Sequence, residues 1–237
     1  GVFDLPFLFT DFKEVDLVLD GPVGKRLLER LSEKNLVGLC YFENGFRHVT
    51  NSRRPITKAE DLKGLKIRTI QNPVFIDIFN TLGANATPMP FTEVFSALES
   101  KAIDGQETPY SNIHGNKFYE VSKYISNTGH IYGGAVILAG RKFWDQLSPV
   151  EQKLMQETCN TARDFERSYQ RSEDPKLLAQ IKAKRYRAES GTFTYPMFSE
   201  TFREEDLCVN ASVQQLFATE QITSCNVCAL GGMFMSC

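Results

Sequence analysis

Helix-period and strand-period segments alternate along the first 184 residues of this chain. Residues 22–35 carry apolar side chains at helical spacing, and residues 36–42 are a continuous apolar run of strand length. Residues 65–69 alternate as a short strand does, and residues 72–83 follow with a helical pattern that begins at Asn-Pro and ends at glycine. The alternation predicts an α/β fold.

Local signals predict further boundaries. Residues 43–45 read as a turn, and residues 104–109, which gather polar groups around a glycine, read as a tight loop. Two prolines predict an extended segment at residues 87–91, after which Thr92 is predicted to cap a helix. Residues 130–140 predict a central strand with a glycine bend.

The last regular segment is predicted to be a long helix. Ser148 and Glu151 form a capping box with proline at the first helical position. The sequence Asp174-Pro175 is expected to kink or break this helix, which then resumes to about Lys184. A long helix bent in its middle would suit a chain that passes between two lobes. From residue 185 neither period is present, so an irregular tail is expected.

Composition excludes several classes of partner. The chain has 27 Lys and Arg against 29 Asp and Glu, a net charge of -2, so it has no general attraction to nucleic acid or to an anionic membrane. Its longest apolar run is far too short to cross a bilayer. Residues 1–12 lack a basic leader and a small-residue cleavage site, so no signal peptide is expected within this chain.

The six cysteines are unevenly placed. Cys40 and Cys159 stand alone, and the other four lie within the last 30 residues. A disulfide framework would be expected to spread through the fold. Cys225 and Cys228 form a lone C-x-x-C, which without a second pair is a weak signal for zinc or redox chemistry. No metal and no cofactor are therefore expected.

Arg68 is the most informative charged residue, because it lies where a predicted strand gives way to a helix. In open α/β sheets ligands bind at that edge, where strand ends and helix N-termini direct polar groups into one crevice. A guanidinium matches a carboxylate with two parallel hydrogen bonds, so a small organic acid is the expected ligand. Arg47 follows the predicted turn at a strand end and could face the same crevice. The alternative for Arg68 is a strand-end charge in water.

Catalytic chemistry has little support. The three histidines show no metal-binding spacing, and no nucleophile elbow or phosphate-binding glycine loop is present. Asp104 and Glu107 are the one carboxylate pair that could act as general acid and general base. The sequence offers no third residue, such as a histidine, to assist them. A small-molecule enzyme using this pair is the alternative function.

Four blocks of sequence resemble one family. They are DLKGLKIRTIQNP at residues 61–73, LGANATPMPFTEVFSALESKAIDGQETP at 82–109, NKFYEVSKYISNTGH at 116–130 and KFWDQLSPVEQKLMQE at 142–157. In this order they resemble the extracytoplasmic solute-binding proteins of TRAP (tripartite ATP-independent periplasmic) transporters, in particular the dicarboxylate-binding branch. The resemblance implies a periplasmic protein that is not an enzyme, captures a small organic acid and delivers it to a membrane permease.

The family fold implied is a two-lobed α/β binding protein of type II-like topology with a kinked helix between the lobes. Residues 1–44 and 134–173 would belong to the first lobe, and residues 45–133 and 174–184 to the second. The chain joins the family pattern partway, so the first lobe is expected to be incomplete and the chain a fragment. The family pattern is expected to end near residue 184, which leaves residues 185–237 as the irregular tail.

The resemblance also implies the ligand-binding residues. They are Arg68 as the carboxylate clamp, Arg47 as an assisting arginine, Phe91 as an aromatic wall, Thr108 where the family usually has asparagine, and Gln71 and Asn72, which follow the clamp. A threonine hydroxyl can still donate one hydrogen bond to a carboxylate.

Overall fold

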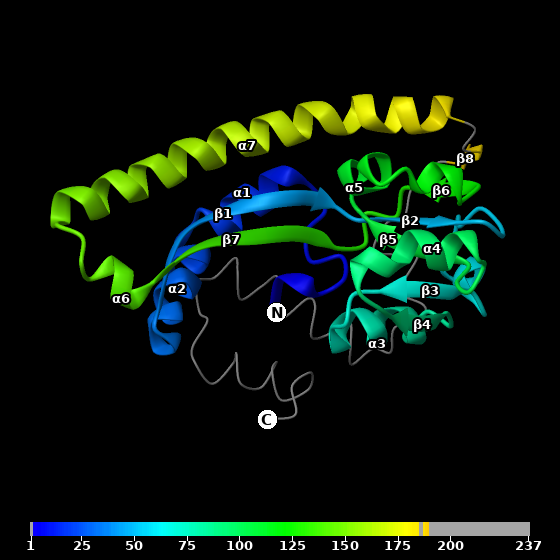
Figure 1. The fold of residues 1–237 in the computed structure, drawn as a ribbon, viewed down its shortest axis with the longest axis horizontal. Coiled ribbons are helices and arrows are strands. Elements are labelled where there is room, and N and C mark those ends of the chain that lie inside the picture. Colours follow the sequence, from blue (N-terminus) through cyan, green and yellow to red (C-terminus); the bar gives the residue numbers. More distant parts are fainter. Residues whose placement is uncertain (1, 185–186, 190–237) are drawn as a thin grey trace.

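The computed structural model describes residues 2–184 and 187–189, which form two β-sheets with one long helix running along both (Figure 1). The rest of the predicted tail, including Cys225 and Cys228, lies outside the described residues. The α/β prediction is confirmed, since helices pack on both sheets. The short 3₁₀ segments are η1 (Val2–Asp4), η2 (Leu31–Lys34), η3 (Ala59–Leu62), η4 (Phe91–Glu93) and η5 (Phe118–Glu120).

The larger sheet has six strands in the order β4-β3-β5-β2-β6-β8. Their bounds are β2 (His48–Asn51), β3 (Lys66–Thr69), β4 (Asn85–Pro88), β5 (Gly105–Thr108), β6 (Tyr124–Ser126) and β8 (Arg187–Glu189). Strand β3 runs parallel to both β4 and β5, whereas β2 is antiparallel to β5 and β6. The three parallel strands therefore end at one edge of the sheet.

Helices cover both faces of this sheet. On one face, α3 (Pro73–Thr81) packs Phe75 and Phe79 against Ile67 of β3. On the other face, α4 (Val94–Glu99) and α5 (Tyr110–Gly115) pack Leu98 and Ile113 against β6. Burial of these side chains fixes which face of each strand is covered and therefore the register of the strands in the sheet.

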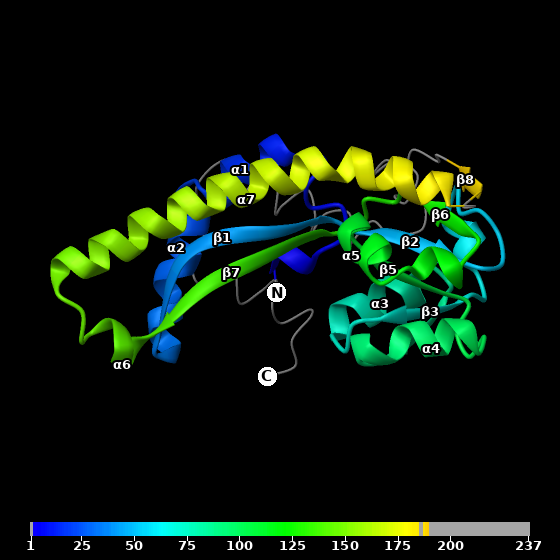
Figure 2. The same ribbon diagram turned by 45° about the horizontal axis from the view of Figure 1, so that its top comes forward.

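The smaller sheet pairs β1 (Leu36–Phe46) with β7 (Tyr132–Gly140) in antiparallel register. Helices α1 (Phe12–Leu19) and α2 (Pro22–Arg30) pack beside it, and α6 (Arg141–Trp144) follows β7. Strand β1 leads directly into β2, and the segment before β7 returns from β6, so two chain segments connect the sheets (Figure 2). They meet where the Arg47 amide donates to the Ile131 carbonyl at 2.9 Å.

Helix α7 (Pro149–Ala183) is 35 residues long and contacts elements of both sheets. Its start at the Ser148 capping box was predicted correctly. Of the predicted kink or break at Asp174-Pro175, the break does not occur: the helix continues through Pro175, and Figure 1 shows it as one curved helix. A proline removes one helical hydrogen bond. Beyond Pro175, buried Ile181 and the partly buried Leu177 and Leu178 pack against the apolar cluster of the larger sheet and hold the helix in place.

Three other predicted boundaries were also wrong. Residues 43–45 do not form a turn but continue β1 through a register shift, at which Gly45 has a φ of 85°. Residues 105–108 form the buried strand β5 rather than a tight loop. Thr92 does not cap a helix, because η4 precedes α4 without a side-chain cap.

A disulfide that the sequence analysis did not predict joins β1 to α7. Cys40 of β1 and Cys159 of α7 are buried and bonded, with Cα atoms 6.1 Å apart and 119 residues between them in sequence. Each cysteine stands alone in sequence, so spacing could not reveal the pair. The bond fixes the N-terminal half of α7 to β1 and is of a kind that persists in oxidising compartments.

Candidate functional site

Arg68 lies near the carboxyl end of β3 and is only 3% exposed. Its Nε and Nη2 atoms both donate to the Met89 carbonyl, at 3.1 and 2.8 Å. No carboxylate of the described residues pairs with it, and its Nη1 atom has no hydrogen-bond partner among them. The backbone therefore orients the guanidinium but leaves one edge of it available for an anion.

An aromatic side chain lies against this guanidinium. The Arg68 Cζ atom is 5.6 Å from the centroid of the Phe91 ring, a cation–π distance. Phe91 is 38% exposed and forms a T-shaped contact with Phe118, with ring centroids 5.9 Å apart. Burial lowers the pKa of Arg68. The negative charge of Glu107 opposes this lowering, whereas the positive charge of Arg47 adds to it. An incoming carboxylate would offset this burial of charge.

Arg47 lies between β1 and β2 and is committed to a carboxylate of the protein itself. Its Nε atom donates to Glu107 Oε2 at 2.5 Å and its Nη2 atom to Glu107 Oε1 at 2.8 Å. The same Nη2 atom also reaches the Glu107 carbonyl at 3.0 Å, and the guanidinium stacks 5.2 Å from the Phe75 ring. The Nε and Nη2 donors of Arg47, which could otherwise bind a ligand carboxylate, are thus occupied by Glu107 in this structure.

Glu107 is fully buried, and its oxygens have further partners. His130 Nε2 lies 3.3 Å from Glu107 Oε2, and Thr128 Oγ1 lies 2.8 Å from His130 Nδ1. Burial alone would raise the pKa of Glu107, but the charge of Arg47 and the hydrogen bonds from His130 and Arg47 outweigh it and hold this pKa below its usual value. Glu107 is therefore a buried carboxylate that stabilises Arg47 where two chain segments connect the sheets.

His48 lies beside this network without joining it. Its ring stacks on Tyr110 with centroids 4.1 Å apart, and its Nδ1 atom accepts a hydrogen bond from the Gly129 amide at 3.2 Å. Burial, with a smaller effect of nearby His130, lowers the pKa of His48 to about 3. The imidazole is thus neutral at physiological pH. Sequence reasoning missed the roles of Glu107, His130 and His48, because their partners are distant along the chain.

The remaining predicted residues lie around the ends of β3 and β5. Thr108 is buried at the end of β5, where its hydroxyl accepts from Asn112 Nδ2 at 3.1 Å. Asn72 caps α3 by accepting from the Val74 amide at 3.0 Å, and its amide group donates to Asp4 at 3.3 Å. Gln71 is exposed. Thr108 keeps its hydroxyl proton for a further acceptor, whereas the side chain of Asn72 is already engaged.

Asp104 and Glu107 do not form an acid–base pair. Asp104 precedes β5 and accepts from the Lys66 amide at 2.9 Å, and its other oxygen lies 3.6 Å from Arg53. Glu107 lies near the opposite end of β5 and is occupied by Arg47. The two carboxylates therefore have separate partners, and neither is placed to relay a proton to the other.

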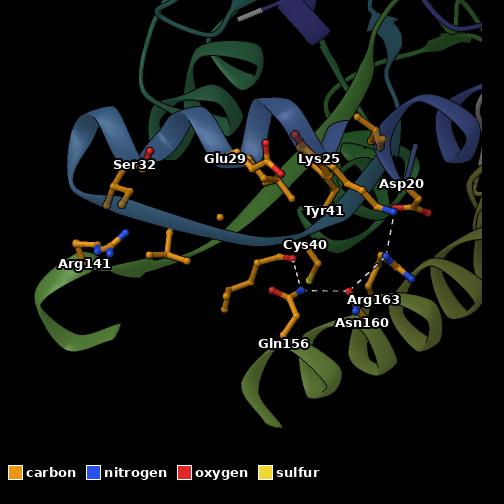
Figure 3. A pocket seen from close by; sticks show the side chains of 16 residues that line it. Asp20, Lys25, Glu29, Ser32, Cys40, Tyr41, Arg141, Gln156, Asn160 and Arg163 are labelled. Atoms are coloured by element: carbon orange, nitrogen blue, oxygen red, sulfur yellow. Dashed lines mark hydrogen bonds and ion pairs between the residues drawn. The ribbon is translucent and has the colours of Figure 1, made fainter. Parts of the chain in front are cut away.

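A separate cavity of about 710 Å³ lies at the outer edge of β1, between α2 and α7 (Figure 3). In it Gln156 donates to the Leu39 carbonyl at 2.6 Å, and Arg163 reaches Asp20 at 3.3 Å. None of the residues predicted to bind ligand lines this cavity. It carries both acidic and basic side chains, so it does not select for an anion.

The described residues contain neither a candidate metal cluster nor a candidate membrane-spanning helix. No three His, Cys, Asp or Glu side chains of residues 2–184 and 187–189 gather as metal ligands would. Among the same residues, no helix combines the length and the apolar character needed to cross a bilayer.

Comparison with known sequences assigns a family. The sequence model described as "Bacterial extracellular solute-binding protein, family 7" (DctP) matches residues 1–204. The expected end of the family pattern near residue 184 was therefore too early, although residues 190–204 lie outside the described residues. The chain is 40% identical to the 2,3-diketo-L-gulonate-binding periplasmic protein YiaO of Escherichia coli over 182 residues, covering 77% of this chain and 56% of YiaO. With the C4-dicarboxylate-binding protein DctB of Bacillus subtilis it is 34% identical, covering 77% of this chain and 52% of DctB.

Solved structures give the same answer. A TRAP periplasmic solute-binding protein from Ochrobactrum anthropi matches with a TM-score of 0.80 and 40% identity, over 98% of this chain and 70% of that one. The sugar acid binding protein DctPAm from Advenella mimigardefordensis, in complex with galactonate, matches with a TM-score of 0.78 and 44% identity, over 92% of this chain and 68% of that one. The chain spans about half the length of the curated relatives it matches. It belongs to the DctP family of TRAP periplasmic solute-binding proteins, which are not enzymes.

Proposed function

We propose that this chain is part of a TRAP solute-binding protein that captures a small organic acid through Arg68 and delivers it to a membrane permease. The observation that carries the proposal is the state of Arg68, which is buried, oriented by the Met89 carbonyl and without a carboxylate partner among the described residues. A buried guanidinium edge of this kind is stabilised by a bound carboxylate. Relatives crystallised with galactonate and D-erythronate support an acid as the ligand class.

Each neighbour has a proposed part in binding. Phe91 forms one wall beside the guanidinium, and Thr108 donates its free hydroxyl proton to the ligand. Arg47 acts on the ligand through its charge, since its donors are held by Glu107. Exposed Gln71 can reach a ligand directly, whereas Asn72 supports the start of α3.

The two sheets are proposed to correspond to two lobes that close on the ligand. Residues 1–44 and 134–173 would form the first lobe, and residues 45–133 and 174–184 the second. The two connections between the sheets and the continuous helix α7 support this division, because closure would then bend only a few segments. Such closure adds the binding energy that one clamp cannot supply. A charged bidentate contact contributes about 1.5–3 kcal/mol, whereas micromolar capture requires about 8 kcal/mol.

A thermal-shift screen tests the ligand class. The full chain is heated with sugar acids and C4-dicarboxylates, each beside a neutral analogue of the same size, for example galactonate beside galactitol. An acid present at about one hundred times its Kd adds about 2.7 kcal/mol, which raises Tm by roughly 5–10 °C for a chain of this length. Equal shifts with an acid and its neutral analogue, or no shift with any acid, would contradict the proposal.

A further inference from the structure

His48 is a nearly buried residue to which the proposed function gives no part. It is the first residue of β2 and is 8% exposed. Its ring stacks on Tyr110, and an apolar aromatic ring could make the same contact. The two nitrogen atoms of the imidazole therefore need an explanation of their own, because polar atoms in nearly buried positions usually have partners.

The backbone fixes which nitrogen of His48 carries the proton. The Gly129 amide donates to Nδ1 at 3.2 Å, so Nδ1 presents a lone pair. An imidazole that accepts at Nδ1 is neutral and carries its proton on Nε2. Burial lowers the pKa of His48 to about 3, in agreement with this assignment. His48 is therefore a neutral hydrogen-bond donor at Nε2.

This Nε2 donor is free. It has no hydrogen-bond partner among residues 2–184 and 187–189, where the one hydrogen bond of the ring is that to Nδ1. The fully buried side-chain atoms without a partner in the same part of the chain are Asn51 Nδ2, Thr69 Oγ1, Gln106 Oε1, Ser122 Oγ and Arg167 Nε. Since His48 Nε2 is not among them, it borders space that solvent can enter. A ligand oxygen can replace solvent there.

The pairing of the strands places this donor beside the clamp. Arg68 of β3 pairs with Gln106 of β5, and His48 of β2 pairs with Thr108 of β5. Paired residues share one face of a sheet, as do residues two apart along a strand. Arg68, Thr108 and His48 therefore lie on one face, on three adjacent strands. Strands β3 and β5 end at the edge where antiparallel β2 begins.

Each of these three side chains has a donor to spare. They are Nη1 of Arg68, the hydroxyl proton of Thr108 and Nε2–H of His48. We propose that His48 is a ligand-binding residue that donates from Nε2 to a hydroxyl or keto oxygen of the acid whose carboxylate Arg68 holds. The inference rests on the proposed function, because it takes Arg68 as the site of the carboxylate. Neighbouring strands lie about 4.8 Å apart, so three of them span about 10 Å, the scale of an extended acid of about six carbons.

The charges at this edge define the class of acid further. Arg47 is the cation whose charge acts on Arg68, and it is already paired with Glu107. The neutral donors of His48 and Thr108 suit a hydroxyl or keto oxygen. A second carboxylate would be buried beside them without a cation of the described residues to pair with, which is costly. The site should therefore prefer a monocarboxylate with hydroxyl groups to a dicarboxylate of the same length.

Calorimetry with galactonate as the probe tests the role of His48. His48→Phe keeps an aromatic ring beside Tyr110 but removes the Nε2 donor. It should weaken galactonate binding about three- to tenfold, the loss of one neutral hydrogen bond. His48→Gln is the matched control, because it also lacks the imidazole but carries an amide donor close to the position of Nε2. It should bind galactonate within about twofold of the unmodified chain.

Adipate tests the class of acid. It has the same six-carbon length as galactonate but carries a second carboxylate and no hydroxyl group. The unmodified chain should bind galactonate at least about tenfold more tightly than adipate. His48→Phe should narrow this difference, because it removes a donor that only galactonate uses.

Four results would overturn the inference. They are undiminished galactonate binding in His48→Phe, equal losses in His48→Phe and His48→Gln, adipate bound as tightly as galactonate, and no binding of either acid. Equal losses would mean that His48 only supports the fold. The proposed function is judged separately by Arg68→Ala: if acid binding is lost there, the proposed function stands even where the part of His48 fails. Circular dichroism and thermal unfolding without ligand check that each variant is folded.

Discussion

The buried pair of Arg47 and Glu107 allows a sharp test of how the site is supported. Glu107→Gln keeps the shape and one acceptor oxygen but removes the negative charge opposite Arg47, whose donors lie 2.5 and 2.8 Å from the carboxylate. Both residues are buried, so the remaining guanidinium cannot be solvated without opening the structure. Breaking one side of a buried ion pair costs about 3–5 kcal/mol, and we expect about 3 because the amide oxygen still accepts.

Urea denaturation measures this loss. With a slope of about 1–3 kcal/mol/M, a loss of 3 kcal/mol lowers the midpoint by roughly 1–3 M. Asp104→Asn is the matched control, since its ion pair with Arg53 is long, at 3.6 Å, the Arg53 side chain is 66% exposed, and the pair should contribute less than about 1 kcal/mol. If Glu107→Gln were no more costly than Asp104→Asn, the carboxylate would not be holding Arg47, and Arg47 would be free to clamp a ligand.

Two further predictions concern stability. Replacing Cys40 and Cys159 together by alanine should lower the free energy of unfolding by about 2–5 kcal/mol in denaturant titrations without reductant, because the bond closes a loop across 119 residues; an unchanged midpoint would mean that the bond does not form. His48 has a pKa of about 3 in the folded state against about 6.5 when unfolded, so below pH 6.5 the unfolded chain binds the extra proton and stability falls with falling pH. Between pH 7 and pH 5 this amounts to about 2 kcal/mol, and a His48→Gln variant that shows the same pH dependence would refute the assignment.

Helices and strands with a regular apolar period could be predicted from the sequence. The strand that carries Arg68 and the helix that begins at Asn72-Pro73 form where the pattern placed them. The capping box at Ser148 also begins a helix. In each case the signal lies within a few neighbouring residues, which is the distance over which sequence patterns report.

Strand β5 could not be predicted, because its burial depends on distant partners. Gln106 donates to Thr50 at 2.9 Å, and Glu107 pairs with Arg47, residues separated from them by 56 and 60 positions. A polar strand is buried at little cost only when such partners exist. The sequence does not show which distant residues contact this segment, so the segment was predicted to be a loop. The supporting role of Glu107 was missed for the same reason.

Long-range geometry also explains the other differences. The 119 residues between Cys40 and Cys159 hide their disulfide, and packing beyond Pro175 outweighs the local preference for a break. The position of Arg68 was predicted, whereas the engagement of Arg47 by a protein carboxylate was not. Local patterns thus located the clamp but not the network that supports it.

Calorimetry of Arg68 variants tests the central claim most directly. The acid that gives the largest thermal shift is titrated into the unmodified chain, Arg68→Ala, Arg68→Lys and the control Arg53→Ala, whose side chain is 66% exposed. We expect no measurable binding to Arg68→Ala and unchanged binding to Arg53→Ala. Binding to Arg68→Lys should be weakened, because an ammonium group cannot make the two parallel hydrogen bonds that a guanidinium makes to a carboxylate. Undiminished affinity in Arg68→Ala would contradict the assignment of Arg68 as the carboxylate clamp.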